Sequence, residues 1–277
     1  MNRIETSSPV TTSRLQSMGK QEPAPLFPIE IIAMRTCERV VMRQRWRDLL
    51  FLHWPVDPEM LRRRLPPGLD LDLFGGAAYI GLVPFTMEGV RPRWLPPVKG
   101  LSAFHETNVR TYVHRDGREP GVWFFSLDAA NRLAVRIARR LFHLPYYDAR
   151  MFLEREGFPP SVGSSAVLYG GVRRWPGFAD ASYQIRAEAV GPVEPARAGT
   201  LEHFLVERYL LYAEHRGRLF QGRVRHAPYP LQPARVHAID ERLVAAAGVR
   251  RPSTGPMAHY AAGVDVDVLA LRRLRRD

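Results

Sequence analysis

Apolar and polar residues alternate along much of this chain, and the alternation predicts a protein built mainly of strands. In the segment 104–113, Glu106, Asn108, Arg110 and Tyr112 fall on one face of a strand, and the residues between them fall on the other. A carboxylate, an amide, a guanidinium and a phenol in one row are unusual for a core face. This row is therefore predicted either to face solvent or to line a polar cavity.

Further strands are predicted around short turns. Asp116-Gly117 is a strong hairpin signal, and Pro176-Gly177 and Arg216-Gly217 separate two more pairs of strands. The predicted strands cover 77–85, 104–113, 122–127, 166–175, 181–190, 209–214, 218–225 and 259–268. Several hairpins together with a few helices predict an α+β fold, in which helices pack on an antiparallel sheet that is bent or closed.

Four short helices are predicted from their caps and from apolar residues at helical spacing. They are a helix that follows Asp57 and stops at Pro66, a stronger one that Asp128 caps and that ends before Pro145, a third over 201–208 after Thr200, and a fourth over 241–247 that Gly248 ends.

Residues 1–28 are rich in Ser, Thr, Pro and Gln, and we expect a disordered leader there because little apolar surface could offset the entropy of ordering it. Residues 29–277 are predicted to form one domain. No signal peptide and no apolar run long enough to cross a membrane is visible, and the single cysteine, Cys37, cannot form an internal disulfide. These features predict a cytoplasmic protein that does not enter a membrane.

The chain has 40 Lys and Arg against 28 Asp and Glu, a net charge of +12, and only two of the cations are lysines, Lys20 and Lys99. The arginines are scattered instead of forming the stripe that a nucleic-acid surface needs. Nucleic-acid binding is therefore the least favoured of the functions considered.

Known catalytic and metal motifs are missing from the sequence. It has no His-Glu-x-x-His, Cys-x-x-Cys, Gly-x-Ser-x-Gly or phosphate-binding loop, so we expect no metal and no cofactor. Cys37 lies beside Glu38, which disfavours a thiolate nucleophile. Lys99 lies in a proline-rich loop, which is a poor place to desolvate an amine for a Schiff base.

The helix predicted after Asp128 has Arg136, Arg139 and Arg140 along one ridge. Such a ridge usually faces solvent. The alternative is that one of these arginines turns inward to neutralise Glu106, which a buried carboxylate would require.

Seven segments together resemble the uncharacterised bacterial YqjF family. They are WRDLLFLHW at 46–54, LPPGL at 65–69, ETNVRTYV at 106–113, GVWFFSLD at 121–128, LPY at 144–146, FLVERY at 204–209 and HAPYP at 226–230. The resemblance covers about residues 40–240 in order. Thr107 departs from it, where a leucine is expected, and so does Tyr229, where the family tends to have tryptophan.

That family is in turn similar, more distantly, to the acetoacetate decarboxylase superfamily. This similarity implies a mostly antiparallel β-barrel or cone with a few packed helices around a small-molecule cavity, and homo-oligomers are common among such proteins. By order along the chain, Glu106 matches a cavity-facing glutamate and Pro145 a proline before the Schiff-base lysine. The lysine position then falls on Tyr146, with Tyr147 beside it. Because a phenol cannot form an imine, decarboxylation by the family's mechanism is not expected.

The first functional hypothesis is a cavity that binds a carbonyl or carboxylate compound and acts on it by lysine-independent acid–base chemistry. Glu106 is expected to act as acid or base and Tyr146 to donate a hydrogen bond, while Arg110, Asn108 and Tyr112 contact the substrate. The second hypothesis is a non-enzymatic binding or sensing domain, which would hold Glu106 in a fully satisfied ion pair. The third is nucleic-acid binding through the arginines.

Overall fold

The computed structural model describes residues 39–155, 166–176 and 180–275. The predicted leader, its boundary at residue 28, Cys37 and Gly177 lie outside these residues. Within them, the elements in chain order are β1 (Val40–Val56), α2 (Pro58–Arg62), β2 (Asp70–Leu71), β3 (Ala78–Pro92), β4 (Phe104–Arg115), β5 (Arg118–Ala129), α3 (Arg132–Leu141), β6 (Tyr146–Arg155), β7 (Val167–Trp175), β8 (Ser182–Ala189), α4 (Leu201–Val206), β9 (Leu210–His215), β10 (Arg218–Arg225), β11 (Leu231–Glu241), α5 (Leu243–Ala246), β12 (Met257–Leu269) and β13 (Arg272–Arg273).

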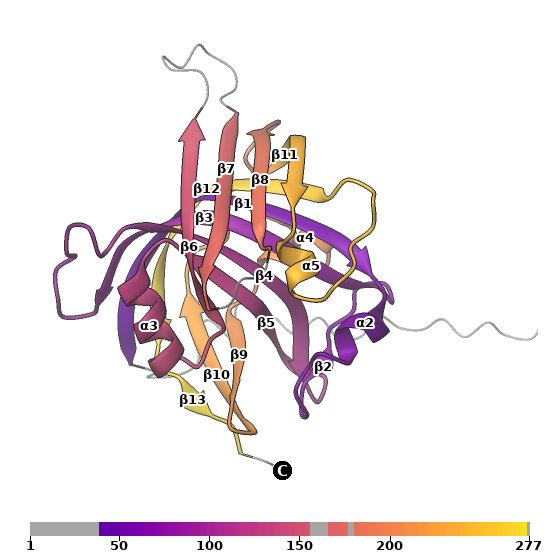
Figure 1. Ribbon diagram of the computed structural model, residues 1–277. Coiled ribbons are helices and arrows are strands. Elements are labelled where there is room, and N and C mark those ends of the chain that lie inside the picture. The colour runs from indigo at the N-terminus through magenta and orange to yellow at the C-terminus, as the bar shows by residue number, and fades with distance from the viewer. Residues whose placement is uncertain (1–38, 156–165, 177–179, 276–277) are drawn as a thin grey trace, which may run out of the picture.

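The strands of the described residues form one sheet that closes on itself twice. Its order is β13-β10-β9-β5-β6-β7-β8-β11-β12-β1-β3-β4-β2, and β10 also pairs with β12 and β4 with β5. Strands β12, β1, β3, β4 and β5 therefore belong to two rings, one completed by β6, β7, β8 and β11 and the other by β9 and β10. Figure 1 shows β6, β7, β8 and β11 above the long shared strands, and β9 and β10 below them. The predicted barrel-like, mainly antiparallel fold is confirmed.

Strands β1, β3 and β4 are buried on both faces over much of their length. On β1, Leu50, Leu52 and Trp54 belong to the core enclosed by β7 and β8, whereas Leu49 and Phe51 belong to the core on the other side. A strand that is buried on both faces reads as a continuous apolar run without alternation. This explains why the sequence did not reveal β1 as a strand.

Most of the predicted strands are present with small shifts at their ends. The turns Asp116-Gly117 and Arg216-Gly217 have positive φ at both positions, with values of 50°, 68°, 53° and 69°, as two-residue hairpin turns require. Strands β6 and β11 and the two-residue strands β2 and β13 were missed along with β1. Charged residues interrupt the alternation in β6, and Pro233 interrupts it in β11.

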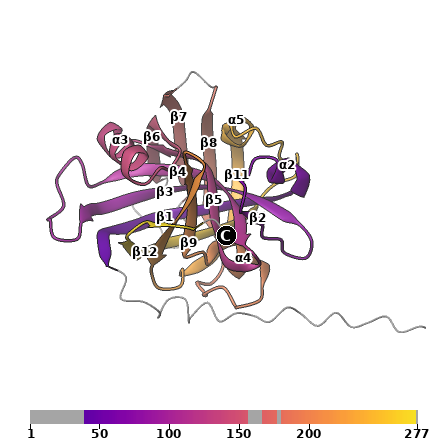
Figure 2. The same ribbon diagram turned by 90° about the horizontal axis from the view of Figure 1, so that it is seen from below.

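The helices are present but shorter than predicted. Asp57 and Thr200 cap α2 and α4 as expected. The predicted cap of α3 is wrong: Asn131 caps it by accepting from the amides of Leu133 and Ala134, while Asp128 lies inside β5. Figures 1 and 2 show α3 at one end of the barrel and α2 and α5 at the other. Over the described ranges, each helix is too short or too polar to cross a bilayer.

Candidate functional site

A cavity of about 370 Å³ lies on the β9–β10 side of the shared strands. Strands β1, β3, β4 and β5 supply one wall, and β9, β10, α3 and the loop between β3 and β4 supply the rest. Its volume is in the range of small-molecule pockets, which is about 300–1,000 Å³. Most of its lining is apolar, and the polar lining groups include Glu106, Asn108 and Arg110 of β4.

The polar row of β4 faces this cavity and not solvent. Glu106, Asn108 and Arg110 are 3%, 5% and 8% exposed, so the reading of this face as a solvated one is excluded. The residues between them point into the other core, where Val109 packs and Thr107 donates to the hydroxyl of Tyr183 at 2.6 Å. Each face of β4 therefore belongs to a different compartment.

Glu106 is a buried carboxyl whose described partner is a phenol. The Tyr146 hydroxyl donates to Glu106 Oε2 at 2.9 Å. Burial raises the pKa of Glu106 to about 8, the hydrogen bond from Tyr146 opposes the rise, and the nearby Asp128 carboxylate adds to it. Burial together with the Glu106 charge holds the pKa of Tyr146 well above its usual range. The pair expected from order along the chain is thus in direct contact.

Arg110 is a buried cation that has no carboxylate partner among residues 39–155, 166–176 and 180–275. Its Nη2 donates to the carbonyl of Leu205 at 2.9 Å, and its guanidinium carbon lies 5.6 Å from the ring centre of Phe51. Its Nε is buried with no hydrogen-bond partner in the structure. Gly81, opposite Arg110 on β3, makes room for both His53 and Arg110, since a Cβ there would lie 3.0 Å from His53 Cδ2 and 3.3 Å from Arg110 Cγ.

Asn108 presents a second unsatisfied group to the same cavity. Its Oδ1 is buried and accepts no hydrogen bond in the structure. Burying an amide oxygen or a guanidinium N–H without a partner costs roughly 1–3 kcal/mol each. Two such groups on one strand face, next to a cavity, are what a polar ligand would satisfy.

Tyr112 does not line the cavity, although it shares the β4 face. It is fully buried, its hydroxyl donates to the Leu205 carbonyl at 2.8 Å, and His53 Nε2 lies 2.7 Å from that hydroxyl. Burial and the charge of Arg110 hold the pKa of His53 well below its usual value. Tyr112 therefore supports the Leu205 carbonyl, which in turn holds Arg110, and its expected contact with substrate is not retained.

Two lining residues were missed as functional candidates. Arg208 forms an ion pair with Asp72 at 2.6 Å and reaches the cavity next to Arg110. Tyr229 lines the cavity too, and its backbone amide donates to Glu207 Oε1 at 2.9 Å. Both residues lie in segments that resemble the family, which was the signal that could have identified them.

The alternative, in which an arginine of α3 turns inward to neutralise Glu106, is not found among the described ion pairs. Arg139 of α3 does turn inward, but it donates to the backbone carbonyl of Tyr146 at 2.5 Å. The neutralised carboxylate is Asp128, which Arg173 of β7 grips with two hydrogen bonds of 2.7 and 2.8 Å. Glu106 consequently stays buried without a cation.

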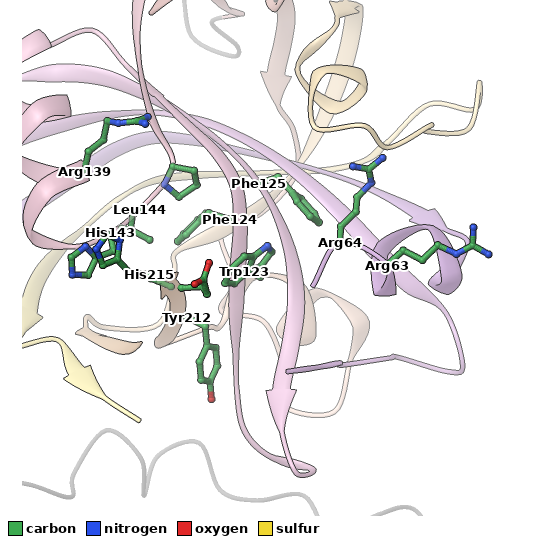
Figure 3. Close-up of a pocket in the computed structure, with 13 residues that line it drawn as sticks. Arg63, Arg64, Trp123, Phe124, Phe125, Arg139, His143, Leu144, Tyr212 and His215 are labelled. Carbon is green, nitrogen blue, oxygen red and sulfur yellow. The ribbon is translucent and has the colours of Figure 1, made fainter. Parts of the chain in front are cut away.

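A larger groove of about 680 Å³ adjoins the cavity, and Phe124 and Leu144 line both. Figure 3 shows Arg63 and Arg64 on one side of this groove and His143 and His215 on the other. The two histidine rings stack with their centres 4.1 Å apart, and both arginines are exposed. Because exposed groups can bond to water, we place the candidate site at the Glu106 cavity.

In the described parts of the chain, no three His, Cys, Asp or Glu side chains come together as metal ligands would.

The sequence matches the model of a protein family over residues 43–265, which is most of the chain. This family is DUF2071, described as an uncharacterised conserved protein. The chain belongs to it. A relative in Bacillus subtilis (strain 168), the uncharacterized protein YqjF, is 39% identical over 233 residues, which span 84% of this chain and 92% of the relative. The resemblance drawn from the motifs is confirmed.

Solved structures with the same fold are acetoacetate decarboxylase-like. An acetoacetate decarboxylase-like enzyme from Sphingomonas wittichii RW1 matches with a TM-score of 0.57 and 14% identity over 86% of this chain and 95% of its own. The acetoacetate decarboxylase of Legionella pneumophila matches with a TM-score of 0.56 and 11% identity, over 92% and 93%. The enduracididine biosynthesis enzyme MppR, complexed with pyruvate, matches with a TM-score of 0.56 and 14% identity, over 91% and 96%. At such identities the similarity establishes the fold alone.

Proposed function

We propose that this protein binds a small carboxylate with a nearby carbonyl or hydroxyl group and acts on it by acid–base chemistry at Glu106. The observation that supports this most strongly is that one cavity-facing strand row holds both the buried carboxyl of Glu106 and the buried guanidinium of Arg110, which has no carboxylate partner among the described residues. Arg110 binds the anionic group of the ligand, and the Asn108 Oδ1 accepts a hydrogen bond from a hydroxyl group of the ligand. The fold neighbours include a pyruvate complex and acetoacetate decarboxylases, whose ligands belong to the same chemical class.

The chemistry proposed for Glu106 is proton transfer. With a pKa of about 8, Glu106 exchanges protons readily near neutral pH. It removes a proton from the carbon next to a carbonyl, and Tyr146 donates a hydrogen bond that steadies the carboxylate. In a dehydration, that proton and the hydroxyl of the next carbon leave together as one water molecule.

The proposed reaction does not use a lysine. By order along the chain, the resemblance matches Tyr146 to the Schiff-base lysine of the decarboxylases, and a phenol cannot form an imine. Lys99 lies in the exposed loop at the mouth of the cavity. An exposed amine is not desolvated, so its surroundings do not activate it as a nucleophile.

The test measures proton exchange at the carbon next to the carbonyl of small oxo acids, such as C3 of 2-oxobutanoate, by proton NMR in D₂O. We expect the wild-type protein to accelerate exchange, Glu106→Gln to lose at least 100-fold of that rate, and Lys99→Met to keep it. Treatment with borohydride in the presence of the oxo acid should leave the protein mass unchanged. If Glu106→Gln keeps both binding and exchange, the assignment is wrong.

The non-enzymatic sensing function makes a different prediction. It requires Glu106 in a fully satisfied ion pair, whereas the described structure gives Glu106 a phenol partner and a raised pKa. Tight binding of oxo acids by the wild-type protein without any exchange would favour sensing over catalysis.

A further inference from the structure

The cavity changes character in one direction along β4. The register of β3 against β4 sets Gly81 opposite Arg110, Phe85 opposite Glu106 and Met87 opposite Phe104. At about 3.3 Å per residue, the distance along β4 from Arg110 to Phe104, where the loop between β3 and β4 ends, is about 20 Å. The lining is charged at the Arg110 end, and beyond Glu106 it is mainly apolar.

The polar groups of the outer part are already satisfied by the protein. Gln44 Oε1 accepts from the Trp46 indole at 2.8 Å, Arg91 donates to the Gly89 carbonyl at 2.9 Å, and Asn131 caps α3. In the inner part, Asn108 and Arg110 each have a buried polar atom without a hydrogen-bond partner, whereas none of these outer groups has one. An apolar ligand can therefore bind in the outer part without leaving a polar group of the protein unpaired there.

The mouth of the cavity is apolar as well. Its rim consists of residues that line the cavity and are also exposed, namely Leu95, Val98, Leu101, Leu133 and Ile137, at 50%, 53%, 44%, 50% and 44%. Asn131 Nδ2 donates to the Leu101 carbonyl at 2.9 Å and so ties the loop to α3. Five large apolar side chains around one opening are well suited to contact a hydrocarbon chain that passes between them.

We infer that the ligand of this site is a medium-chain carboxylate, with its anionic head on Arg110 and its hydrocarbon tail directed toward the mouth between α3 and the 92–102 loop. The inference rests on the proposed function and narrows its substrate class. Glu106 lies four strand positions outward from Arg110, on the same face, so it adjoins the ligand beyond its head. An oxygen function there is the one that Glu106 and Tyr146 would reach.

The test compares binding of butanoate, octanoate, dodecanoate and 1-dodecanol by isothermal titration calorimetry. We expect affinity to rise about threefold per added methylene up to dodecanoate, because each buried CH₂ contributes to transfer out of water. Dodecanol, which lacks the charge, should bind at least tenfold more weakly than dodecanoate. Equal affinity for all chain lengths, or equal affinity for dodecanol and dodecanoate, would overturn the inference.

Two variants locate the tail. Ile137→Asp places a charge at the rim, and it should weaken dodecanoate binding at least tenfold while leaving butanoate binding unchanged. The matched control is Leu141→Asp, because Leu141 is exposed on the same helix and does not line the cavity. If the two variants bind dodecanoate equally well, the tail does not run along α3 and the inference is wrong.

The failure of this inference can be told apart from failure of the proposed function. If short and long carboxylates bind equally and Arg110→Met abolishes both, the proposed site stands and the medium-chain tail is wrong. If no carboxylate binds the wild-type protein, or if Arg110→Met has no effect, the proposed function itself is wrong. Circular dichroism of each variant verifies that it is folded.

Discussion

Glu106 shows how one residue can be held in an unfavourable state by the rest of a fold. A buried carboxyl without a cation keeps its proton to a higher pH than usual, and the Tyr146 hydroxyl offsets only part of the burial. The nearby Asp128 carboxyl is also buried, but it differs from Glu106 because Arg173 forms an ion pair with it. Two buried carboxyls in one region thus have different partners and different chemistry.

Tyr146→Phe should raise the pKa of Glu106 above its present value of about 8. The reason is that the phenol hydroxyl donates to Glu106 Oε2 and favours the charged form. The carboxyl signal of Glu106 in ¹³C NMR, followed against pH, measures the change. Tyr147→Phe is the matched control, because Tyr147 is the adjacent tyrosine and does not line the cavity. An unmoved titration in Tyr146→Phe would contradict the assignment.

Glu106 should also make folding stability depend on pH. Its pKa rises from 4.5 in the unfolded chain to about 8 in the folded one, so the folded state holds the proton more tightly. This contribution to stability is fully present below about 4.5 and is lost as pH rises through about 8. Urea unfolding across that window should show that the wild type loses stability relative to Glu106→Gln, by several kcal/mol at most. A difference that does not change with pH would be inconsistent with a buried protonated carboxyl.

The residues of the site were found in different ways. Strand alternation placed Glu106, Asn108 and Arg110 on one face, because that pattern is local in sequence. Whether the face was wet or buried could not be read from it, since burial depends on β9, β10 and α3. Tyr146 came from the family resemblance alone, and Arg208 was missed because its reach into the cavity depends on contacts distant in sequence.

Among the elements, β5 is the one on which the smaller ring closes. It pairs with β4 on one side and, in parallel, with β9 through Val122 and Trp123 on the other. Gly121 lies at the start of this junction, where a Cβ would be 2.7 Å from the Leu210 carbonyl oxygen. The close approach of β9 to β5 therefore requires a residue without a side chain.

Gly121→Val should lower the free energy of unfolding by about 1–3 kcal/mol, because the added side chain forces β5 and β9 apart. Chemical denaturation measures the loss, and carboxylate binding should weaken with it because β9 lines the cavity. Gly255→Ala is the control, since an added Cβ there meets no atom within 4 Å. Equal stability of the two variants would show that β5 and β9 can separate without cost.

The whole molecule carries a net charge of +12, and its arginines are spread over many elements. Several of them form ion pairs with carboxylates, for example Arg47 with Asp265, Arg208 with Asp72 and Arg272 with Glu119. Nucleic-acid affinity that depends on phosphate contacts needs unpaired cations gathered on one surface.

We therefore expect no retarded band for a short duplex DNA in a gel-shift experiment at physiological salt. A weak shift at low salt that vanishes as salt rises would reflect net charge alone. Specific retention of one sequence at physiological salt would contradict this prediction and restore nucleic-acid binding as a function.

At the scale of the fold, the hairpins and the antiparallel class were predictable because Asp-Gly turns and alternating strands are local signals. The double closure was not, since it depends on β12 pairing with β1, β10 and β11, which lie far apart in the chain. The missed β1 shows the same limit, because burial on both faces removes the alternation that identifies a strand.

Because alternate residues of β4 face two different compartments, substitutions that affect core packing and substitutions that affect the cavity fall at different positions of this strand. Positions 107, 109 and 111 serve the packed core, where Thr111 also bonds to the carbonyl of Tyr79. Positions 106, 108 and 110 serve the cavity. Substitutions at the even positions can therefore alter ligand preference while the odd positions keep the strand in place. A combinatorial library restricted to the even positions would explore new chemistry on an unchanged scaffold.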